Sequence, residues 1–183
     1  MITKKLASVA AAAVFGCGVA ASCASAATQT PAAQASTGTT HLMVYSVNSD
    51  GPDFKAIATG AVGDYGPGVS VLPNGTVDPD HTSELQLNLT RGSFRISIAT
   101  IGKDVIKAYQ HWPSNPATCS GSIRFTAPAP IVAGTGTGTY RGVTGSFSLT
   151  VTIDEVDVKP VCNGTSAFLA QVILMDGTGT VSF

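Results

Sequence analysis

Hydrophobic and polar residues alternate with a period of two in several parts of the chain. Leucine occupies every second position of 84–90, and Phe or Ile does so across 93–98. The same alternation recurs in 146–153. Because successive side chains of a strand point to opposite faces of a sheet, each run predicts a strand with one core face and one polar face. Residues 84–101 are predicted to form a β-hairpin.

Weaker strand patterns surround these runs, and Asp-Gly and Asn-Gly pairs separate several of them. They cover 41–47, 54–62, 70–72, 122–126, 131–133, 167–175 and 178–183. The best candidate for a helix, 102–110, is short. The sequence therefore predicts an all-β fold, an antiparallel barrel of about eight strands, with a β-sandwich as the alternative.

One predicted strand, 167–175, is apolar on both faces, and only Gln171 interrupts it. A strand of this kind requires a partner on each side of the sheet. The long connection 104–118 could fold over it, or it could line a subunit interface or a ligand cavity.

The first 26 residues have the layout of an export signal. Lys4 and Lys5 precede an apolar run over 6–22, and small side chains at 24–26 mark a cleavage site. The next segment, 27–40, has no charge and no aromatic residue, which predicts a flexible tether. A single β-barrel-like domain is predicted over 41–183.

This leader predicts a protein that is secreted or held in the cell envelope. The alternative is a lipoprotein, because Cys17 and Cys23 each follow residues that resemble a weak lipid-attachment signal. A membrane is expected as a partner only if one of these two cysteines is lipidated.

Cleavage removes two of the four cysteines and leaves Cys119 and Cys162. Outside the cytosol such a pair is expected to form a disulfide, which contributes about 4 kcal/mol in the chain-entropy model. The bridge spans the glycine-rich segment 134–142, and we expect it to pin the barrel shut across that corner.

Charge and motifs exclude several functions. Loss of the leader takes two of the ten Lys and Arg residues and leaves eight against eleven Asp and Glu, a net charge of −3, so no nucleic-acid partner is expected. No Gly-x-Ser-x-Gly motif is present, and no catalytic residue, cofactor or metal is assigned. The acids of 78–81 are interpreted as turn residues, and those at 154, 155 and 157 as solvated charge.

The glycine-rich segment fails both phosphate-loop templates and is predicted to have a structural role, as a sharply coiled strand, a barrel corner or a point where another chain approaches closely. The sequence Gly-Thr-Gly-Thr-Tyr-Arg-Gly-Val-Thr-Gly-Ser-Phe at 136–147, and Gly-Thr-Gly-Thr-Val-Ser-Phe at 177–183, resemble bacterial secreted proteins of the allene oxide cyclase and dirigent barrel-like type. The resemblance implies an eight-stranded antiparallel barrel, often oligomeric, with an apolar cavity. In the plant members that cavity confines a reactive lipid or radical. The family's functional residues cannot be placed on this chain.

Three aromatic residues are candidates for ligand binding: Trp112, Tyr140 and Phe168. Trp112 could instead plug one end of the barrel. The leading hypothesis is a non-enzymatic barrel that binds an apolar small molecule or a protein partner. A cyclase-like enzyme that acts through its cavity is the second, and a structural envelope protein that forms a homo-oligomer is the third.

Overall fold

The structure, a computed structural model, describes residues 36–47, 53–165 and 167–183. Its strands are β1 (Thr37–Val47), β2 (Asp53–Gly60), β3 (Asp64–Val71), β4 (Glu84–Leu89), β5 (Gly92–Ser97), β6 (Ser120–Pro130), β7 (Thr144–Asp157) and β8 (Phe168–Ser182). Its helical elements are α1 (Ala99–Tyr109) and the 3₁₀ turn η1 (Gly138–Tyr140).

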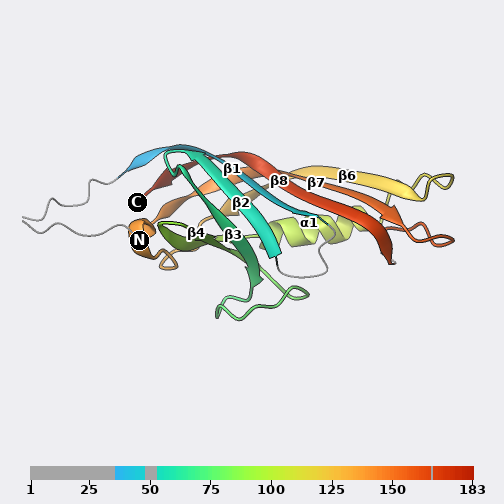
Figure 1. The fold of residues 1–183 in the computed structure, drawn as a ribbon, viewed down its shortest axis with the longest axis horizontal. Coiled ribbons are helices and arrows are strands. Elements are labelled where there is room, and N and C mark those ends of the chain that lie inside the picture. The colour runs from blue at the N-terminus through green and yellow to red at the C-terminus, as the bar shows by residue number, and fades with distance from the viewer. Residues whose placement is uncertain (1–35, 48–52, 166) are drawn as a thin grey trace, which may run out of the picture. The chain divides into compact units, whose positions relative to one another are not determined.

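These eight strands form one antiparallel sheet in the order β5-β4-β3-β2-β1-β8-β7-β6, and the sheet curls into a half-barrel (Figure 1). The predicted all-β antiparallel architecture of eight strands is confirmed. The described chain contains a single curled sheet and not the two packed sheets of a sandwich.

Several strands are longer than the sequence pattern predicted. The two segments predicted at 167–175 and 178–183 merge into β8, which pairs with β1 on one side and with β7 on the other. β1 begins at Thr37, so the last four residues of the predicted tether belong to the sheet. The predicted signal, the rest of the tether up to residue 35, and Cys17 and Cys23 lie outside the described residues.

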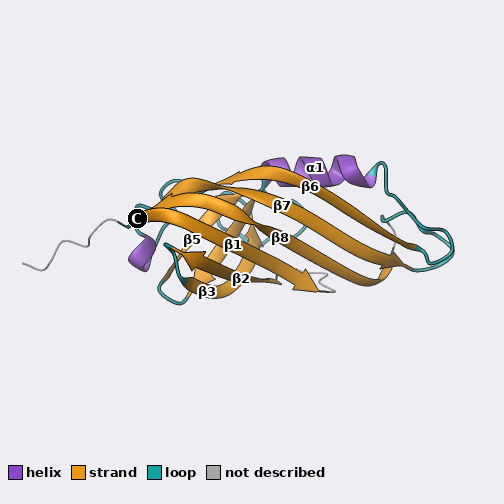
Figure 2. Ribbon diagram, turned by 90° about the horizontal axis from the view of Figure 1, so that it is seen from above, coloured by secondary structure: helices purple, strands orange, loops and turns teal. Residues whose placement is uncertain are grey.

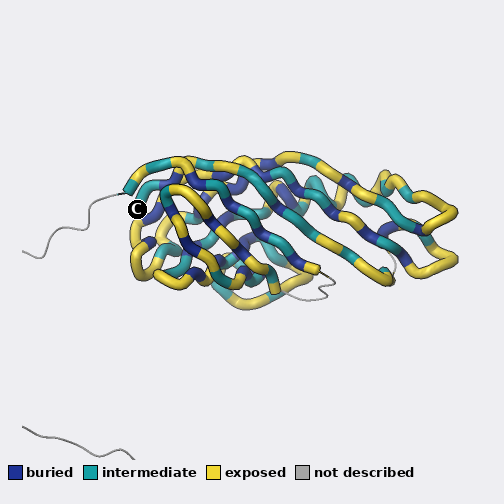
Figure 3. The backbone as a smooth tube through the Cα atoms, turned by 45° about the horizontal axis from the view of Figure 1, so that its top comes forward, coloured by how far each residue is buried: buried dark blue, intermediate teal, exposed yellow. Residues whose placement is uncertain are grey.

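Buried and exposed residues alternate along the strands (Figure 3). The buried residues form one hydrophobic core on the inner face of the curled sheet. The helix α1 lies alongside β6 (Figure 2) and packs its apolar side against this inner face. Ile101 is buried, and Val105 and Tyr109 follow it at helical spacing on the same side. None of the helices in the described ranges has the length and apolarity needed to cross a membrane.

The two edges of the sheet approach each other at the glycine-rich segment. Ile131 makes an isolated bridge to Ile96 of β5, and the amides of Val132 and Thr137 donate to carbonyls of β5 at 2.9 and 2.8 Å. Gly138 has φ +56°, and a Cβ there would lie 2.4 Å from the carbonyl oxygen of Arg91. Only glycine fits this close approach, so the segment has the structural role that was predicted, as a loop with a 3₁₀ turn packed against β5.

The apolar character of β8 on both faces has two separate explanations. The inner face is covered by α1 and the core, where Met175 is buried. On the outer face Leu169 is 68% and Val172 40% exposed, and the described chain places nothing over them. The sheet register shifts between Val156 and Asp157, and this irregularity turns Phe168 toward the inner face.

Candidate functional site

A pocket of about 460 Å³ lies between α1 and the inner face of the half-barrel. Apolar side chains make most of its wall: Phe54, Ile98, Ile101, Val105, Val151, Ile153, Phe168, Ile173 and Met175. The other lining residues are Gly102 and Tyr109 of α1, Ser70 of β3, and Pro79, Asp80 and Thr82 of the loop between β3 and β4. The volume falls within the range of small-molecule sites, about 300–1,000 Å³. Of the three predicted ligand residues, Phe168 lines this pocket.

Beyond Ile153, the inner face of β7 carries two acids. Glu155 is 3% and Asp157 1% exposed. Asp154, the residue between Ile153 and Glu155 in the sequence, points outward and is exposed. The prediction of solvated charge at all three positions is therefore wrong for Glu155 and Asp157. The alternation of buried and exposed residues over 147–153 continues to residues 155 and 157. This continued alternation is the sequence signal that indicates burial of the two acids.

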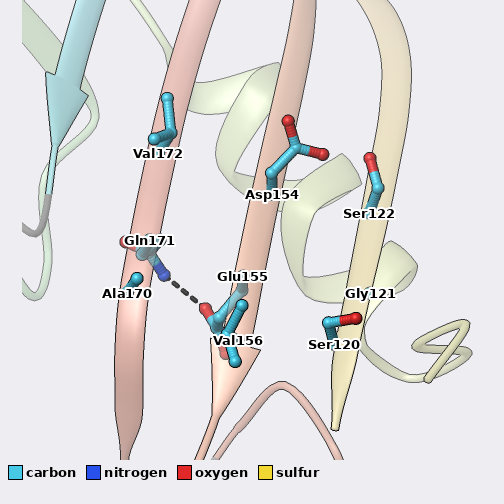
Figure 4. A pocket seen from close by; sticks show the side chains of 9 residues that line it. All are labelled: Ser120, Gly121, Ser122, Asp154, Glu155, Val156, Ala170, Gln171 and Val172. Atoms are coloured by element: carbon cyan, nitrogen blue, oxygen red, sulfur yellow. Dashed lines mark hydrogen bonds between the residues drawn. The ribbon is translucent and has the colours of Figure 1, made fainter. Parts of the chain in front are cut away.

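Donors from neighbouring elements reach these carboxyl groups. The side-chain amide of Gln171, directly opposite on β8, donates to Glu155 Oε2 at 2.5 Å (Figure 4), and the Tyr109 hydroxyl donates to the same oxygen at 3.4 Å. The Gly164 amide donates to Asp157 Oδ2 at 3.0 Å. Glu155 Oε1 and Asp157 Oδ1 are buried and receive no hydrogen bond from a donor elsewhere in the described chain, and the two carboxyl groups lie close enough to share a proton.

The electrostatics of this pair favour a bound proton. Burial raises the pKa of Glu155 to about 7, and the neighbouring Asp157 carboxyl adds to the rise, while the hydrogen bonds from Gln171 and Tyr109 oppose it. Burial also raises the pKa of the Tyr109 hydroxyl, with the charge of Glu155 as the next cause, so this phenol stays a donor. The pair can therefore take up or release a proton near neutral pH.

Trp112 does not line the pocket but packs behind one of its walls. Its ring stacks on Tyr109 with centroids 5.1 Å apart and an interplanar angle of 9°. A Cβ at Gly121 or at Gly164 would lie within 2.6 Å of the indole, so glycine at both positions makes room for it. The indole Nε1 is buried and has no partner among the described residues. This placement matches the alternative of an aromatic plug.

Tyr140, the third predicted ligand residue, lies in the core at the glycine-rich corner. It is fully buried, it contacts Phe94 and Phe183 edge to face, and its hydroxyl donates to Asp64 Oδ2 at 2.6 Å. Burial, followed by this bond to Asp64, raises the pKa of Tyr140 to about 12. Tyr140 is thus a core residue, and the pocket lies elsewhere.

Asp64 is the centre of a network with all its donors in place. It accepts hydrogen bonds from the hydroxyls of Tyr140 and Thr90 and from backbone amides of residues 65, 90 and 91. Burial raises the pKa of Asp64, but these hydrogen bonds together hold it well below its usual range.

Cys119 and Cys162 form a disulfide with their Cα atoms 4.9 Å apart, which confirms the predicted pairing. Cys119 directly precedes β6 and Cys162 lies in the β7–β8 loop, so the bridge sits at the end of the β6–β7 hairpin that carries Glu155 and Asp157. The expectation that it pins the glycine-rich corner is wrong, because that corner lies at the hairpin's other end. The Asp157 amide donates to the Cys119 carbonyl at 2.8 Å, which joins the bridge to the acidic pair.

The described ranges hold no group of three or more His, Cys, Asp or Glu side chains arranged for a metal ion. Asp78 accepts hydrogen bonds from the backbone amides of Asp80 and His81 at 3.0 Å each and so acts as a turn residue.

Models of protein families, curated proteins and solved structures were compared with the chain, and none of them matches it.

Proposed function

We propose that this protein is a secreted or cell-envelope half-barrel that binds an apolar small molecule in the pocket beneath α1. The observation that carries the proposal is the pocket itself, about 460 Å³ with a mainly apolar wall that includes two phenylalanines. The disulfide is compatible with a place outside the cytosol. The sequence resemblance to the allene oxide cyclase and dirigent type implies an apolar cavity, which supports the proposal.

Gly102 allows a direct test. It lines the pocket, and an added Cβ would meet nothing within 4 Å, so Gly102→Phe should fill the pocket without disturbing the backbone. Replacing a helical glycine also favours the helix by up to about 1 kcal/mol, which protects the fold of the variant. Ile106→Phe is the matched control, because Ile106 lies on the same helix and is 65% exposed.

Binding of decanol is measured by the fluorescence of Trp112, the single tryptophan, which stacks on the pocket residue Tyr109. We expect saturable binding to the wild type and to Ile106→Phe, and at least a tenfold loss for Gly102→Phe. Native mass spectrometry of protein purified from its own host would identify the resident ligand. Absence of saturable binding, or equal binding by Gly102→Phe, would overturn the proposal.

A second candidate function is an acid–base enzyme that acts on a ligand in the same pocket. The observation that favours it is the buried Glu155–Asp157 pair, which can exchange a proton near neutral pH and is joined to the pocket wall through Tyr109. The test is turnover: an enzyme of this kind would convert the ligand found by mass spectrometry, and Glu155→Gln would stop that conversion while the ligand still binds.

A further inference from the structure

The pocket beneath α1 has a polar end, where the loop between β3 and β4 folds back on β3. The Asp78 amide donates to the Ser70 carbonyl oxygen at 3.2 Å. The Thr82 hydroxyl donates to the carbonyl of the next residue, Val71, at 2.8 Å. These bonds hold the loop against the strand, and Asp80, Thr82 and Ser70 all line the pocket.

Ser70 presents a hydroxyl group to this end of the pocket. The residue lies on the inner face of β3 and is 5% exposed. Its Oγ makes no hydrogen bond within the ranges that the structure describes. The Thr82 hydroxyl, by contrast, is already bonded to two backbone carbonyls. Small-molecule pockets are mainly apolar, with a few placed polar groups that orient the ligand, and the Ser70 hydroxyl is available for that purpose.

Asp80 carries the only charge in the wall of the pocket. Its side chain is exposed, and it belongs to none of the four ion pairs that join described residues. No lysine, arginine or histidine of the described chain lines the pocket with it. A carboxylate head group would therefore meet a like charge and no cation, whereas a neutral donor would meet a free acceptor.

We propose that the pocket binds a neutral amphiphile whose head group is a hydroxyl. This hydroxyl donates to the Asp80 carboxylate and accepts a hydrogen bond from Ser70 Oγ. The apolar chain lies between α1 and the inner face of the sheet, toward Phe168. A hydroxyl is both donor and acceptor, so it matches one free carboxylate and one free hydroxyl. The inference rests on the proposed function, because it names the class of ligand for the same pocket.

The test on the wild type compares decanol, 1-methoxydecane and decanoate at pH 7, below their micelle concentrations, by the fluorescence of Trp112. The ether accepts a hydrogen bond but cannot donate one, and its extra methyl group favours its burial. A preference for decanol therefore reports the donated hydrogen bond. We expect decanol to bind at least fivefold more tightly than either of the other two.

The possible failures are distinguishable. Binding of 1-methoxydecane as tight as that of decanol would overturn this inference and leave the proposed function standing. Tightest binding of decanoate, which the nearby N-terminus of α1 would favour, would do the same. Absence of saturable binding by all three ligands would overturn both.

The first variant, Asp80→Ala, removes the proposed acceptor. It should lose the preference for decanol, while its affinity for 1-methoxydecane stays within twofold of the wild type. The Asp80 side chain makes no hydrogen bond in the described part of the chain, so the fold should be retained. Asp154→Ala is the matched control, an exposed acid on the outer face of β7, and it should keep the preference. An Asp80→Ala protein with the full fivefold preference would contradict the assignment.

The second variant, Ser70→Ala, removes the proposed donor. Decanol and 1-methoxydecane both accept a hydrogen bond, so the affinity for each should fall at least threefold. Ser46→Ala is the matched control: Ser46 is also 5% exposed and its Oγ has no partner among the described residues, but it does not line the pocket. Both variants should melt at the wild-type temperature, because neither hydroxyl bonds to the described chain. Wild-type affinity of Ser70→Ala for decanol would overturn the proposal.

Discussion

A buried acidic site lies next to each end of the β6–β7 hairpin, Asp64 of β3 at one end and Glu155 and Asp157 of β7 at the other, and the two sites are built in opposite ways. At the glycine-rich corner, Asp64 has five hydrogen-bond donors and lies 3.5 Å from the guanidinium of Arg91. At the disulfide end, Glu155 and Asp157 share few donors, and each keeps one buried oxygen that receives no hydrogen bond from a donor elsewhere in the described chain. The first site holds its carboxylate ionised, and the second holds a proton near pH 7.

The contrast separates an acid that stabilises the fold from acids available for chemistry. A carboxylate with all its donors in place contributes to stability, and it offers a ligand nothing that is free. A buried acid with an unpartnered oxygen next to an apolar pocket costs stability and is typical of functional sites. Burial alone therefore does not distinguish a structural acid from a functional one, whereas the number of hydrogen-bond donors to its carboxyl group does.

Removing the disulfide should have the largest effect. For Cys119→Ser with Cys162→Ser we expect a loss of about 4 kcal/mol in the free energy of unfolding, because 43 residues separate the two positions. Chemical denaturation with and without reductant measures it. Hydrogen exchange should show more rapid exchange in 154–164 than at the Asp64 site. A melting temperature that reductant leaves unchanged would show that the bridge does not stabilise the domain.

Asp64→Asn should destabilise the protein by about 3 kcal/mol, because the amide loses the charge and presents its own N–H groups to hydroxyl donors. Asp157→Asn, which relieves repulsion at the other site, should change the free energy of unfolding by less than about 1 kcal/mol. Asp154→Asn is the exposed control. Equal losses for Asp64→Asn and Asp157→Asn in urea denaturation would remove the distinction between the sites.

Stability should depend on pH in opposite directions at the two sites. The folded pKa of Glu155, about 7, lies above its ordinary value of 4.5, so the folded chain binds the extra proton and stability falls as pH rises from 4.5 to 7, by on the order of 2 kcal/mol. The folded pKa of Asp64 lies below 3.8, so its contribution is present above that pH and is lost as the pH falls further.

Urea denaturation at a series of pH values would measure both slopes. Glu155→Gln should flatten the curve between pH 4.5 and 7 and leave the acid limb in place, and Asp154→Asn should change neither. A wild-type curve that rises over this interval would contradict the raised pKa of Glu155.

The smallest expected effect concerns Tyr109→Phe, which keeps the stack on Trp112 and removes the 3.4 Å hydrogen bond to Glu155. The free energy of unfolding should change by less than about 1 kcal/mol. The pKa of Glu155 should rise, because this hydrogen bond lowers it. Carbon NMR of the Glu155 carboxyl group would measure the shift, with Tyr65→Phe on the exposed outer face as control. A lower pKa in Tyr109→Phe would contradict the arrangement.

The fold was largely predictable because local alternation determines it. Period-two patterns located the β4–β5 hairpin and most of β7 within a few residues, and the short helical candidate at 102–110 corresponds to α1. The merging of segments into β8, and the register irregularity that turns Phe168 inward, depend on pairing with β1 and β7. Such pairing is a tertiary effect that a single strand pattern does not contain.

The candidate site was harder to predict. Phe168 was identified because apolar residues on both phases of a strand are unusual. Acids at a strand end are more often solvated, so local sequence favours an exposed position for Glu155 and Asp157. Only the alternation over 147–153, when it is continued, places these two acids on the inner face. An aromatic ring in a glycine-rich segment is a reasonable ligand candidate, but Tyr140 is a core residue whose hydroxyl bonds to Asp64, 76 residues earlier in the chain.

The half-barrel has two edge strands, β5 and β6, whose free backbone groups could pair with strands of other molecules. The β5 edge is occupied by the backbone of 132–139, which pairs with it in place of a foreign strand. The β6 edge carries Pro128 and Pro130, which lack amide hydrogens, and α1 lies alongside the same strand. A barrel that never closes is thereby protected against edge-to-edge aggregation, and the pocket beneath α1 can remain open.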